Sequence, residues 1–375
     1  MIVHLRRWWL RLHRWVALSV GWLLAAVALL GAVLVLVGPL DRQLHPELFR
    51  AASGATPAAG AALEPLRRRL QAEFGDGATL TFRLPREPGA ALAVGVRGPW
   101  DGTVYLDPRD GHEQGRRGDA DGLRNTLFKL HSSLGLKDTG KAALAWIALL
   151  YLFLLITGLV LWWPRHWPPV LSLELRKGLM RGLFDLHRTG GAVLGLLIAV
   201  SVASGAYMAW RPLGEAVSAV AGAKVVKPPK LPKAVPDAGQ AARDLDAMLA
   251  RARAALPGAP ITLALLPARP DRPLRVRLAL PDDPHPNGLS SVWLDPRDGK
   301  VLAVQRWNAL DPGARAVAWV YPLHTGELGG PLLEALVGLN GLALGMLGVT
   351  GTWLWWKRRR QAASRRPSRA SVASQ

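Results

Sequence analysis

The chain has 375 residues, half of them hydrophobic, and a formal net charge of +20. Such a charge is typical of soluble nucleic-acid-binding proteins, but the short segments 1–14, 164–188 and 357–375 carry 14 of the 20 net charges, so we expect no nucleic-acid partner. The absence of cysteine excludes disulfides, cysteine-ligated iron–sulfur clusters and thioether-attached haem, which leaves histidine as the ligand for any buried iron.

Long uncharged runs predict four transmembrane helices. A helix of about 22 residues is about 33 Å long, enough to cross the hydrocarbon core of a bilayer. The first run follows basic residues, as in a secretory signal peptide, but it exceeds the roughly 7–15 residues of a cleaved apolar region, so we expect it to be retained. The four runs are Trp15–Val37, Ala142–Trp163, Thr189–Trp210 and Ala335–Trp356.

The charge distribution predicts the orientation of these helices. The basic short segments are expected in the cytoplasm together with both termini, because positive residues favour that side. Segments 41–141 and 211–334 have net charges of only +2 and +4, and we expect them outside. The basic tail from Lys357 is expected to contact anionic membrane lipids.

The predicted domains follow from these helices in chain order. They are 1–40 (cytoplasmic N-terminus and first helix), 41–140 (first outer domain), 141–163 (second helix), 164–188 (cytoplasmic loop), 189–211 (third helix), 212–332 (second outer domain), 333–356 (fourth helix) and 357–375 (cytoplasmic tail).

Each outer domain is predicted to be a small α+β unit with one helix and three strands that end in the turn Asp-Pro-Arg-Asp-Gly. We expect residues 51–62 and the proline-rich residues 224–236 to be linkers. The predicted helices are Ala61–Phe74 and Ala238–Leu256. The predicted strands are Ala78–Leu84, Ala91–Val96, Thr103–Leu106, Ile261–Leu266, Leu274–Leu280 and Ser291–Leu294.

Short motifs occur twice in the same order, which indicates a tandem duplication. Leu12-His13-Arg14 recurs as Leu186-His187-Arg188, and VYLDPRDG, ending at Gly111, recurs as VWLDPRDG, ending at Gly299. His131 and His324 also match, at a spacing that aligns Thr157-Gly158 with Thr350-Gly351. Gly31 matches Gly205 at the spacing of the Leu-His-Arg motifs.

A row of glycines in the fourth helix has two interpretations. Gly338, Gly341, Gly345, Gly348 and Gly351 recur every three or four residues with no preceding strand, so they are not a dinucleotide-binding fingerprint. They indicate either close helix packing through small residues or room for a planar macrocycle.

The four repeated histidines are the candidate metal ligands. His13 and His187 lie at the cytoplasmic starts of the first and third helices, whereas His131 and His324 lie just before the second and fourth helices, outside. Ionisable groups at membrane depth are costly and point to function. Two imidazoles on one iron bring their nitrogens within about 4 Å, which residues on opposite membrane faces cannot do. We therefore pair His13 with His187 and His131 with His324.

Two simpler explanations stay open for these histidines. Each alone could be a helix-capping or interfacial residue, and duplication could have copied them without function. The other five histidines have no counterpart in the opposite half, and we assign them no role; they are His4, His45, His112, His166 and His285.

The motifs together resemble the PepSY-associated transmembrane-helix proteins, among them bacterial inner-membrane ferric-siderophore reductases. The resemblance extends from about His4 to Arg358 and includes LHSSLGL, LHRTGG and PLHTGELGG. It implies PepSY-like outer domains in the periplasm and two b-type haems. Each haem would have two histidine ligands, and the four ligands would be His13, His131, His187 and His324. Some relatives add a cytoplasmic flavin and nicotinamide reductase domain, which is not found before Gln375.

The sequence thus predicts a dihaem reductase of the inner membrane with four transmembrane helices and two outer α+β domains. It would take electrons from an unidentified cytoplasmic or quinol donor and reduce a ferric siderophore or other ferric chelate to release Fe(II). The alternatives are a non-catalytic sensor or peptidase regulator and a haem or metal transporter. Trp100, Arg97, Trp307 and Arg306 are scattered candidates for contact with the chelate.

Overall fold

The structure is a computed structural model that describes residues 2–52, 62–164, 167–168, 171, 173–224, 227–231, 244–269 and 271–364. It divides into two compact units. The helical unit comprises Met1–Val35, Leu127–Gly214 and Leu323–Gln375, and the sheet unit comprises Leu36–Thr126 and Glu215–Pro322. The predicted linkers and the end of the basic tail lie largely outside the described residues.

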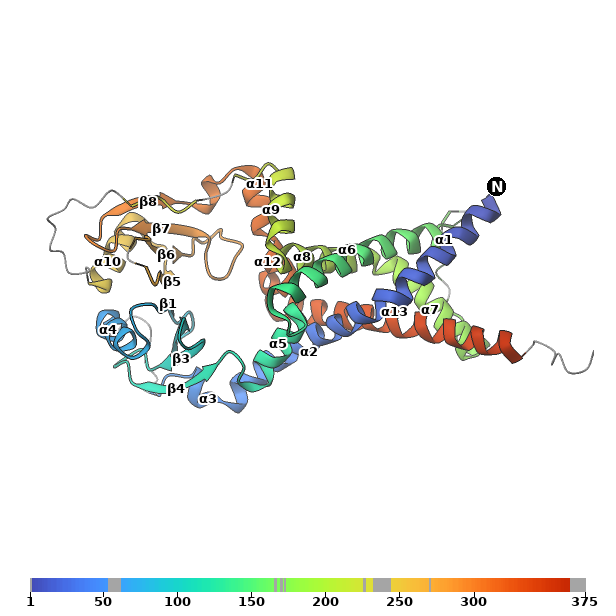
Figure 1. Cartoon of the computed structure of the whole chain (residues 1–375), viewed down its shortest axis with the longest axis horizontal. Coiled ribbons are helices and arrows are strands. Elements are labelled where there is room, and N and C mark those ends of the chain that lie inside the picture. Colours follow the sequence, from blue (N-terminus) through green and yellow to red (C-terminus); the bar gives the residue numbers. More distant parts are fainter. Residues whose placement is uncertain are drawn as a thin grey trace, which may run out of the picture. The chain divides into compact units, whose positions relative to one another are not determined.

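Long apolar helices dominate the helical unit (Figure 1). Among the described residues, three are long and apolar enough to cross a membrane: His4–Leu44, Lys137–Trp162 and Glu327–Ser364. The first contains α1 (Ile2–Val16), the π-helical turn η1 (Ala17–Gly21) and α2 (Trp22–Leu44); the second is α6 (Lys137–Trp162); the third contains η5 (Glu327–Gly329) and α13 (Gly330–Ser364).

The predicted third transmembrane helix is broken. α7 (Leu179–Val193) and α8 (Gly195–Ala209) meet at an angle of 65°, and they make a fourth span only if the bent pair is counted as one. In the aligned halves, Gly21 at the end of η1 corresponds to Gly195 at this break. Both helices therefore depart from regular α-helix about one to two turns after the Leu-His-Arg motif.

The apolar surface of the helical unit indicates contact with lipid. Only 33%, 33% and 28% of the most apolar windows of the three spans are buried. Leu196 and Leu332 are 79% and 75% exposed, a costly arrangement in water but not in a bilayer. The buried remainder, including Leu24, Tyr151, Ile198 and Leu344, packs the helices together.

The strands of the sheet unit form one antiparallel sheet, not the two separate domains that the sequence predicted. In the described residues its order is β4-β3-β2-β1-β5-β6-β7-β8, and Figure 1 shows β1 beside β5. The strands are β1 (Thr79–Arg83), β2 (Leu92–Arg97), β3 (Gly102–Leu106), β4 (Glu113–Gly118), β5 (Ile261–Leu266), β6 (Leu274–Leu278), β7 (Ser290–Leu294) and β8 (Val301–Gln305).

Each half contributes four strands where three were predicted. The additional strands β4 and β8 follow the Asp-Pro-Arg-Asp-Gly turns and close hairpins with β3 and β7. In the first turn the Asp107 carboxylate accepts from the backbone N–H of Arg109 at 2.8 Å, and Gly111 has a φ of +73°. A glycine suits this left-handed conformation, which explains its place in both copies of the motif.

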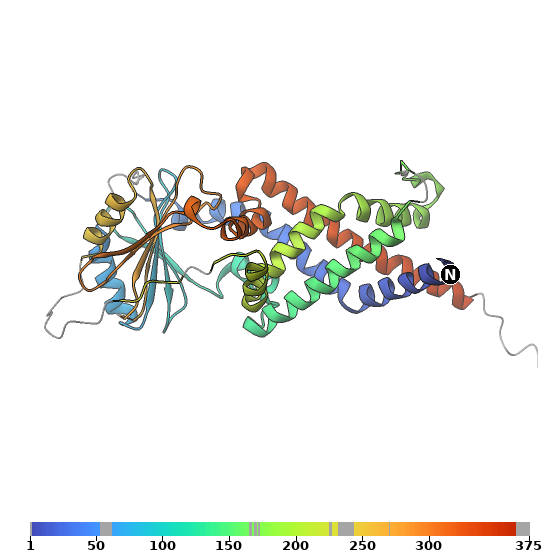
Figure 2. The same ribbon diagram turned by 90° about the horizontal axis from the view of Figure 1, so that it is seen from above.

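Two helices cover one face of the sheet. α4 (Leu63–Phe74) and α10 (Leu245–Ala255) lie on the same side of the strands (Figure 2). Their apolar residues and the alternate strand residues between them make a single core that includes Leu70, Phe82, Val94 and Leu249. Because both halves contribute to this core, neither has a complete core of its own.

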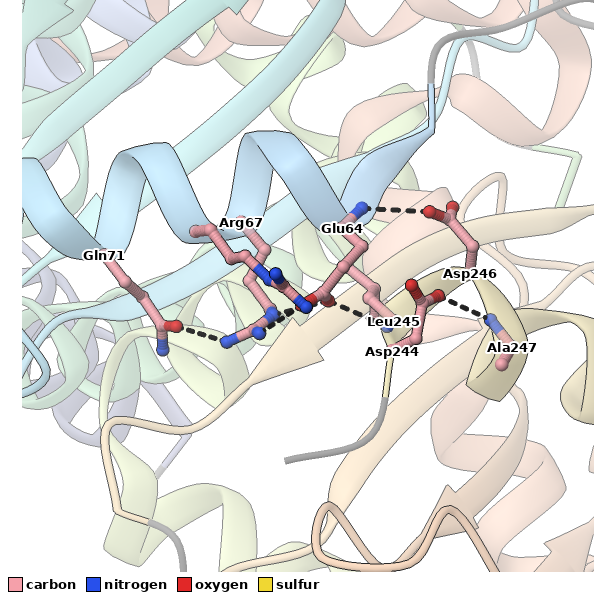
Figure 3. Close-up of polar contacts among 8 residues, drawn as sticks. Glu64, Arg67, Gln71, Asp244, Leu245, Asp246 and Ala247 are labelled. Carbon is pink, nitrogen blue, oxygen red and sulfur yellow. Dashed lines mark hydrogen bonds and ion pairs between the residues drawn. The ribbon is translucent and has the colours of Figure 1, made fainter. Parts of the chain in front are cut away.

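Carboxylates exchanged between the halves cap these helices (Figure 3). The Glu64 carboxylate on α4 accepts from the backbone N–H of Leu245 on α10 at 2.9 Å. Asp246 on α10 accepts in return from the N–H groups of Leu63 and Glu64 at 2.9 and 3.0 Å. Free N–H groups at a helix N-terminus favour negative charge. Arg67 also donates to Glu64, which is 3% exposed.

Short helices complete the described fold. They are α3 (Pro46–Phe49), α5 (Gly122–Ser133), η3 (Leu175–Lys177), α9 (Arg211–Val220), η4 (Trp307–Ala309), α11 (Pro312–Ala318) and α12 (Val320–Thr325). α5 and α12 carry His131 and His324 and precede α6 and α13.

Candidate functional site

The four repeated histidines lie in the helical unit as two pairs. His13 on α1 faces His187 on α7, with ring centroids 6.4 Å apart. His131 on α5 faces His324 on α12, with ring centroids 6.1 Å apart. Each pair joins one histidine from each half. We call them the inner pair (His13 and His187) and the outer pair (His131 and His324).

Each histidine of the inner pair makes a hydrogen bond through Nδ1 to a helix of its own half. His13 Nδ1 lies 2.7 Å from Thr157 Oγ1 on α6. His187 Nδ1 lies 3.1 Å from the carbonyl oxygen of Leu347 and 3.1 Å from Thr350 Oγ1, both on α13. Thr157 and Thr350 occupy the same position in the aligned halves.

The outer pair repeats this pattern on other helices. His131 Nδ1 lies 2.8 Å from the carbonyl oxygen of Val27 on α2. His324 Nδ1 lies 3.1 Å from the carbonyl oxygen of Ser201 and 3.0 Å from Ser204 Oγ, both on α8. Each imidazole is thus fixed by one nitrogen to a neighbouring helix.

The protons of these hydrogen bonds can be assigned by counting donors. A carbonyl oxygen only accepts, so Nδ1 of His131, His187 and His324 carries the proton and donates. At His13 the partner is a hydroxyl, but Thr157 Oγ1 already donates its one proton to the carbonyl of Leu154 at 2.8 Å. It therefore accepts from His13. All four rings are assigned as the Nδ1–H tautomer, which leaves the lone pair on Nε2.

A glycine lies against the ring of each histidine. A Cβ atom at Gly31 would lie 2.8 Å from Cε1 of His131, and one at Gly205 would lie 2.9 Å from Cε1 of His324. At Gly351 it would lie 3.0 Å from Cε1 of His187. At Gly158 it would lie 3.5 Å from Cε1 of His13, which is an ordinary contact. The close approach of ring to helix backbone therefore requires glycine at three of these positions.

The ring separation in both pairs fits one metal ion between two imidazoles. With metal–nitrogen distances of about 2 Å and about 1.1 Å from each nitrogen to its ring centre, two ligating rings have centroids about 6.2 Å apart. The observed 6.4 and 6.1 Å match this value. No group of three or more His, Cys, Asp or Glu residues able to hold a metal occurs in the described residues, so the remaining ligands of such an ion would not come from these side chains.

The hydrogen-bond partners and glycines around the histidines are functional candidates that the sequence analysis did not assign. Their signal was present, since Thr157-Gly158 matches Thr350-Gly351 and Gly31 matches Gly205. Metal-ligating histidines usually donate their second nitrogen to such acceptors, which orient the ring. The repeated positions thus mark the supports of the rings as well as the rings.

The glycine row of α13 serves mainly to pack helices. Cβ atoms at Gly341, Gly345 and Gly348 would lie 2.8 Å or less from the carbonyl oxygen of Ala28 or from the side chains of Leu29 and Ala25 on α2. This is the close crossing expected of small residues. Of the five glycines, Gly351 lies against His187, and room for a macrocycle in this row stays a prediction.

The scattered chelate-contact candidates have local structural roles in the sheet unit. Trp100 stacks on Phe74 of α4, with ring centroids 5.3 Å apart. Arg97 is ion-paired with Asp119 at 3.1 Å, and Trp307 is 8% exposed. The structure does not bring these residues together as one site.

Comparison with known proteins gives one family. No curated protein matches the chain. A family model described as the PepSY-associated TM region matches residues 10–358. This range includes both histidine pairs, all described strands and most of each described helix that could cross a membrane. The chain, a multi-pass membrane protein, belongs to the PepSY-associated transmembrane family.

Proposed function

We propose that this protein is a dihaem b-type reductase of the bacterial inner membrane that passes electrons to a ferric chelate, such as a ferric siderophore, and releases Fe(II). The observation that carries the proposal is the geometry of the two histidine pairs, with ring centroids 6.4 and 6.1 Å apart and every Nδ1 held by a hydrogen bond. A haem would bring most of its iron ligands in its own macrocycle and would need only histidine side chains from the protein. Two histidines without further side-chain ligands suit that requirement.

Polar atoms beside the inner pair also suit a haem. Arg188 Nε and Thr189 Oγ1 are buried and have no hydrogen-bond partner among the described residues. They follow His187 directly on α7. A buried polar group without a partner is costly, and the carboxylates of a haem would be suitable acceptors. This observation favours a tetrapyrrole over a bare metal ion at the inner pair.

The residues of this chain would bind and orient the cofactors. A bound haem supplies reversible one-electron chemistry. His13 and His187 would hold one haem, and His131 and His324 the other. Thr157, Thr350 and the carbonyls of Val27, Leu347 and Ser201 keep the Nδ1 protons in place and thereby fix the ring orientations. If each haem were held by two histidines, outer-sphere electron transfer would be favoured over oxygen activation.

The distribution of charge supports a direction for the electrons. The basic segments 1–14, 164–188 and 357–375 carry 14 of the 20 net charges, which favours cytoplasmic termini and a periplasmic sheet unit. The inner pair would then receive electrons from a cytoplasmic or quinol donor. The outer pair would deliver them to the chelate. We also propose that the two halves arose by tandem duplication.

Vesicles of opposite orientation test this proposal. The haem in right-side-out and inverted vesicles is reduced beforehand, and a membrane-impermeant ferric chelate is added outside. We expect rapid reoxidation only in right-side-out vesicles, with formation of Fe(II). His324→Ala should abolish reoxidation, because it removes the outer haem, while the inner haem should still be reduced from the cytoplasmic side. A protein without haem absorbance, or equal reoxidation in both vesicle types, would refute the proposal.

A further inference from the structure

The face of the sheet opposite α4 and α10 carries a row of arginines. Residues opposite each other on paired strands share a face. Arg83 of β1 pairs with Leu263 of β5, which pairs with Arg277 of β6. Arg275 lies two residues before Arg277 and pairs with Trp293 of β7. Along these strands, the residues that pack against α4 and α10 alternate with the arginines and Trp293, and therefore lie on the other face.

The side chains of this arginine face (Arg83, Arg275 and Arg277) lie along the sheet. Bare Gly95 on β2 makes room for Arg83, since a Cβ there would lie 3.0 Å from Arg83 Nη1. The Arg275 guanidinium stacks 4.9 Å from the centre of the Trp293 ring and donates to Ser291 Oγ at 3.0 Å. Strands from both halves thus place three guanidinium groups on one face of the sheet, and Trp293, which is 7% exposed, packs against Arg275.

These three arginines have no carboxylate partner. In the part of the chain that the structure describes, none makes an ion pair, and Arg277 donates to the carbonyl of Gly288 while its Nε is buried without a partner. Asp283 acts on Arg277 and Asp119 acts on Arg83. The oxygens of Asp283 accept from the N–H groups of Leu289 and His285, however, and Asp119 is ion-paired with Arg97. Arginines held against a protein surface are normally paired with anions.

The surroundings of the arginine face indicate excess positive potential. Burial, together with the positive charge of Arg275, lowers the pKa of Arg277 to about 10. Burial and the charges of Arg277 and Arg86 lower the pKa of His285 to about 4. His285 is therefore neutral at physiological pH, and it is not the source of the positive charge. A bound anion would relieve the repulsion that these groups share.

We infer that the arginine face is the binding site for the ferric chelate, and that it selects anionic chelates, such as tris-catecholates, over neutral ones. Guanidinium groups bind oxyanions through directed N–H groups, and three of them lie on this face across β1, β5 and β6. Charge complementarity favours this occupant, because none of the three arginines makes an ion pair in the described residues. This inference rests on the proposed function for the identity of its ligand.

A redox-inert ligand separates binding from electron transfer. Full-length protein in detergent is dialysed to equilibrium against gallium(III) tris-catecholate, an anionic analogue of the ferric complex that cannot be reduced under these conditions. Gallium(III) tris-hydroxamate, which is neutral, serves as the second probe. The variants are Arg83→Gln, Arg275→Gln and Arg277→Gln. Arg109→Gln, which removes an exposed arginine from a turn of the same unit, is the matched control.

We expect the anionic probe to bind more tightly than the neutral one. Each arginine-face variant should weaken its binding by about tenfold or more, while Arg109→Gln leaves it unchanged. Unaltered circular dichroism and melting temperature would show that the variants fold. Equal binding of the two probes, or tight binding by the triple variant, would overturn the inference. If the gallium probe binds as expected but the ferric complex does not reoxidise reduced haem, the site stands and the proposed reductase function fails.

Discussion

Substitution of Gly31 by alanine tests whether the outer histidines are held as haem ligands. A Cβ at Gly31 would lie 2.8 Å from Cε1 of His131, whereas ordinary contacts begin at 3.4 Å. The ring must therefore withdraw by about 0.6 Å or rotate, and either movement displaces Nε2, the ring nitrogen that is left to bind a metal. Gly158→Ala is the matched control, since its Cβ would lie 3.5 Å from Cε1 of His13.

The expected size of the effect follows from two opposing terms. Overpacking of this kind costs about 1–3 kcal/mol, whereas replacement of glycine by alanine within a helix gains up to about 1 kcal/mol. For Gly158→Ala only the gain applies, so the protein should be as stable as the wild type or more so. For Gly31→Ala the displacement falls on a ligand, and changes next to metal ligands reduce affinity by about 10–100-fold.

Haem content and low-temperature absorbance spectra measure these variants. Gly31→Ala should lose or shift the outer haem signal and keep the inner one, while Gly158→Ala should keep both. Gly205→Ala should reproduce the result of Gly31→Ala at His324, because its Cβ would lie 2.9 Å from Cε1 of that ring. Retention of both unchanged signals in Gly31→Ala and Gly205→Ala would refute the idea that these rings are fixed against the helix backbone for ligation.

Three further predictions follow from the histidine pairs and the helix caps. The protein should contain two haems per chain that acid acetone extracts. His13→Ala and His187→Ala should remove the same haem, and His131→Ala and His324→Ala should remove the other. Loss of the same haem in His13→Ala and His131→Ala would contradict the pairing. Thr157→Val should weaken haem binding at the inner pair more than Thr350→Val, because in the latter His187 keeps its hydrogen bond to the carbonyl of Leu347. Haem titration measures both variants, and equal effects would mean that the hydroxyls are irrelevant. At Glu64, burial would raise the carboxyl pKa, but hydrogen bonds from Arg67, Leu245 and Arg68 lower it from 4.5 to about 2. Ionised Glu64 therefore contributes at most about 3 kcal/mol to stability above pH 4.5, and this contribution is lost as the pH falls toward 2. Thermal unfolding of the sheet unit at a series of pH values should show that loss. Glu64→Gln should be less stable at neutral pH, and its stability should fall less on acidification. An equal fall in the variant and the wild type would mean that Glu64 does not titrate on unfolding.

The sequence predicts the local elements of this protein well because its periodicities are strong. Uncharged runs locate the long helices, and α4, β1 and β5 lie within two residues of the predicted bounds. The polar strand β4, Glu113–Gly118, has no alternating apolar pattern and was missed. The bend at Leu194 was also missed, since nothing in an apolar run of this length distinguishes a broken helix from a straight one.

The tertiary relations were harder to predict, and the histidines show why. Their pairing follows from the repeat and from the thickness of a membrane, which restricts the partners of each ring. The acceptors of their Nδ1 protons are mostly backbone carbonyls, which every residue possesses, so no sequence pattern marks Val27 or Leu347. The hydrogen bonding of β1 to β5 likewise could not be predicted, because no residue pattern within a strand identifies a partner strand far away in the chain.

The pairing of β1 with β5 has a consequence for biosynthesis. About 180 residues separate Arg83 from Ile261, and at about 5–20 residues per second a ribosome takes roughly 10–40 s to make them. During that interval the nascent first half presents β1 as an open edge with unpaired backbone groups, which is the kind of surface that recruits strands from other chains. The N–H groups at the start of α4 also lack their capping carboxylate until Asp246 has been synthesised. Assembly of the sheet therefore depends on the late arrival of the second half, and chains released early would be the ones that aggregate.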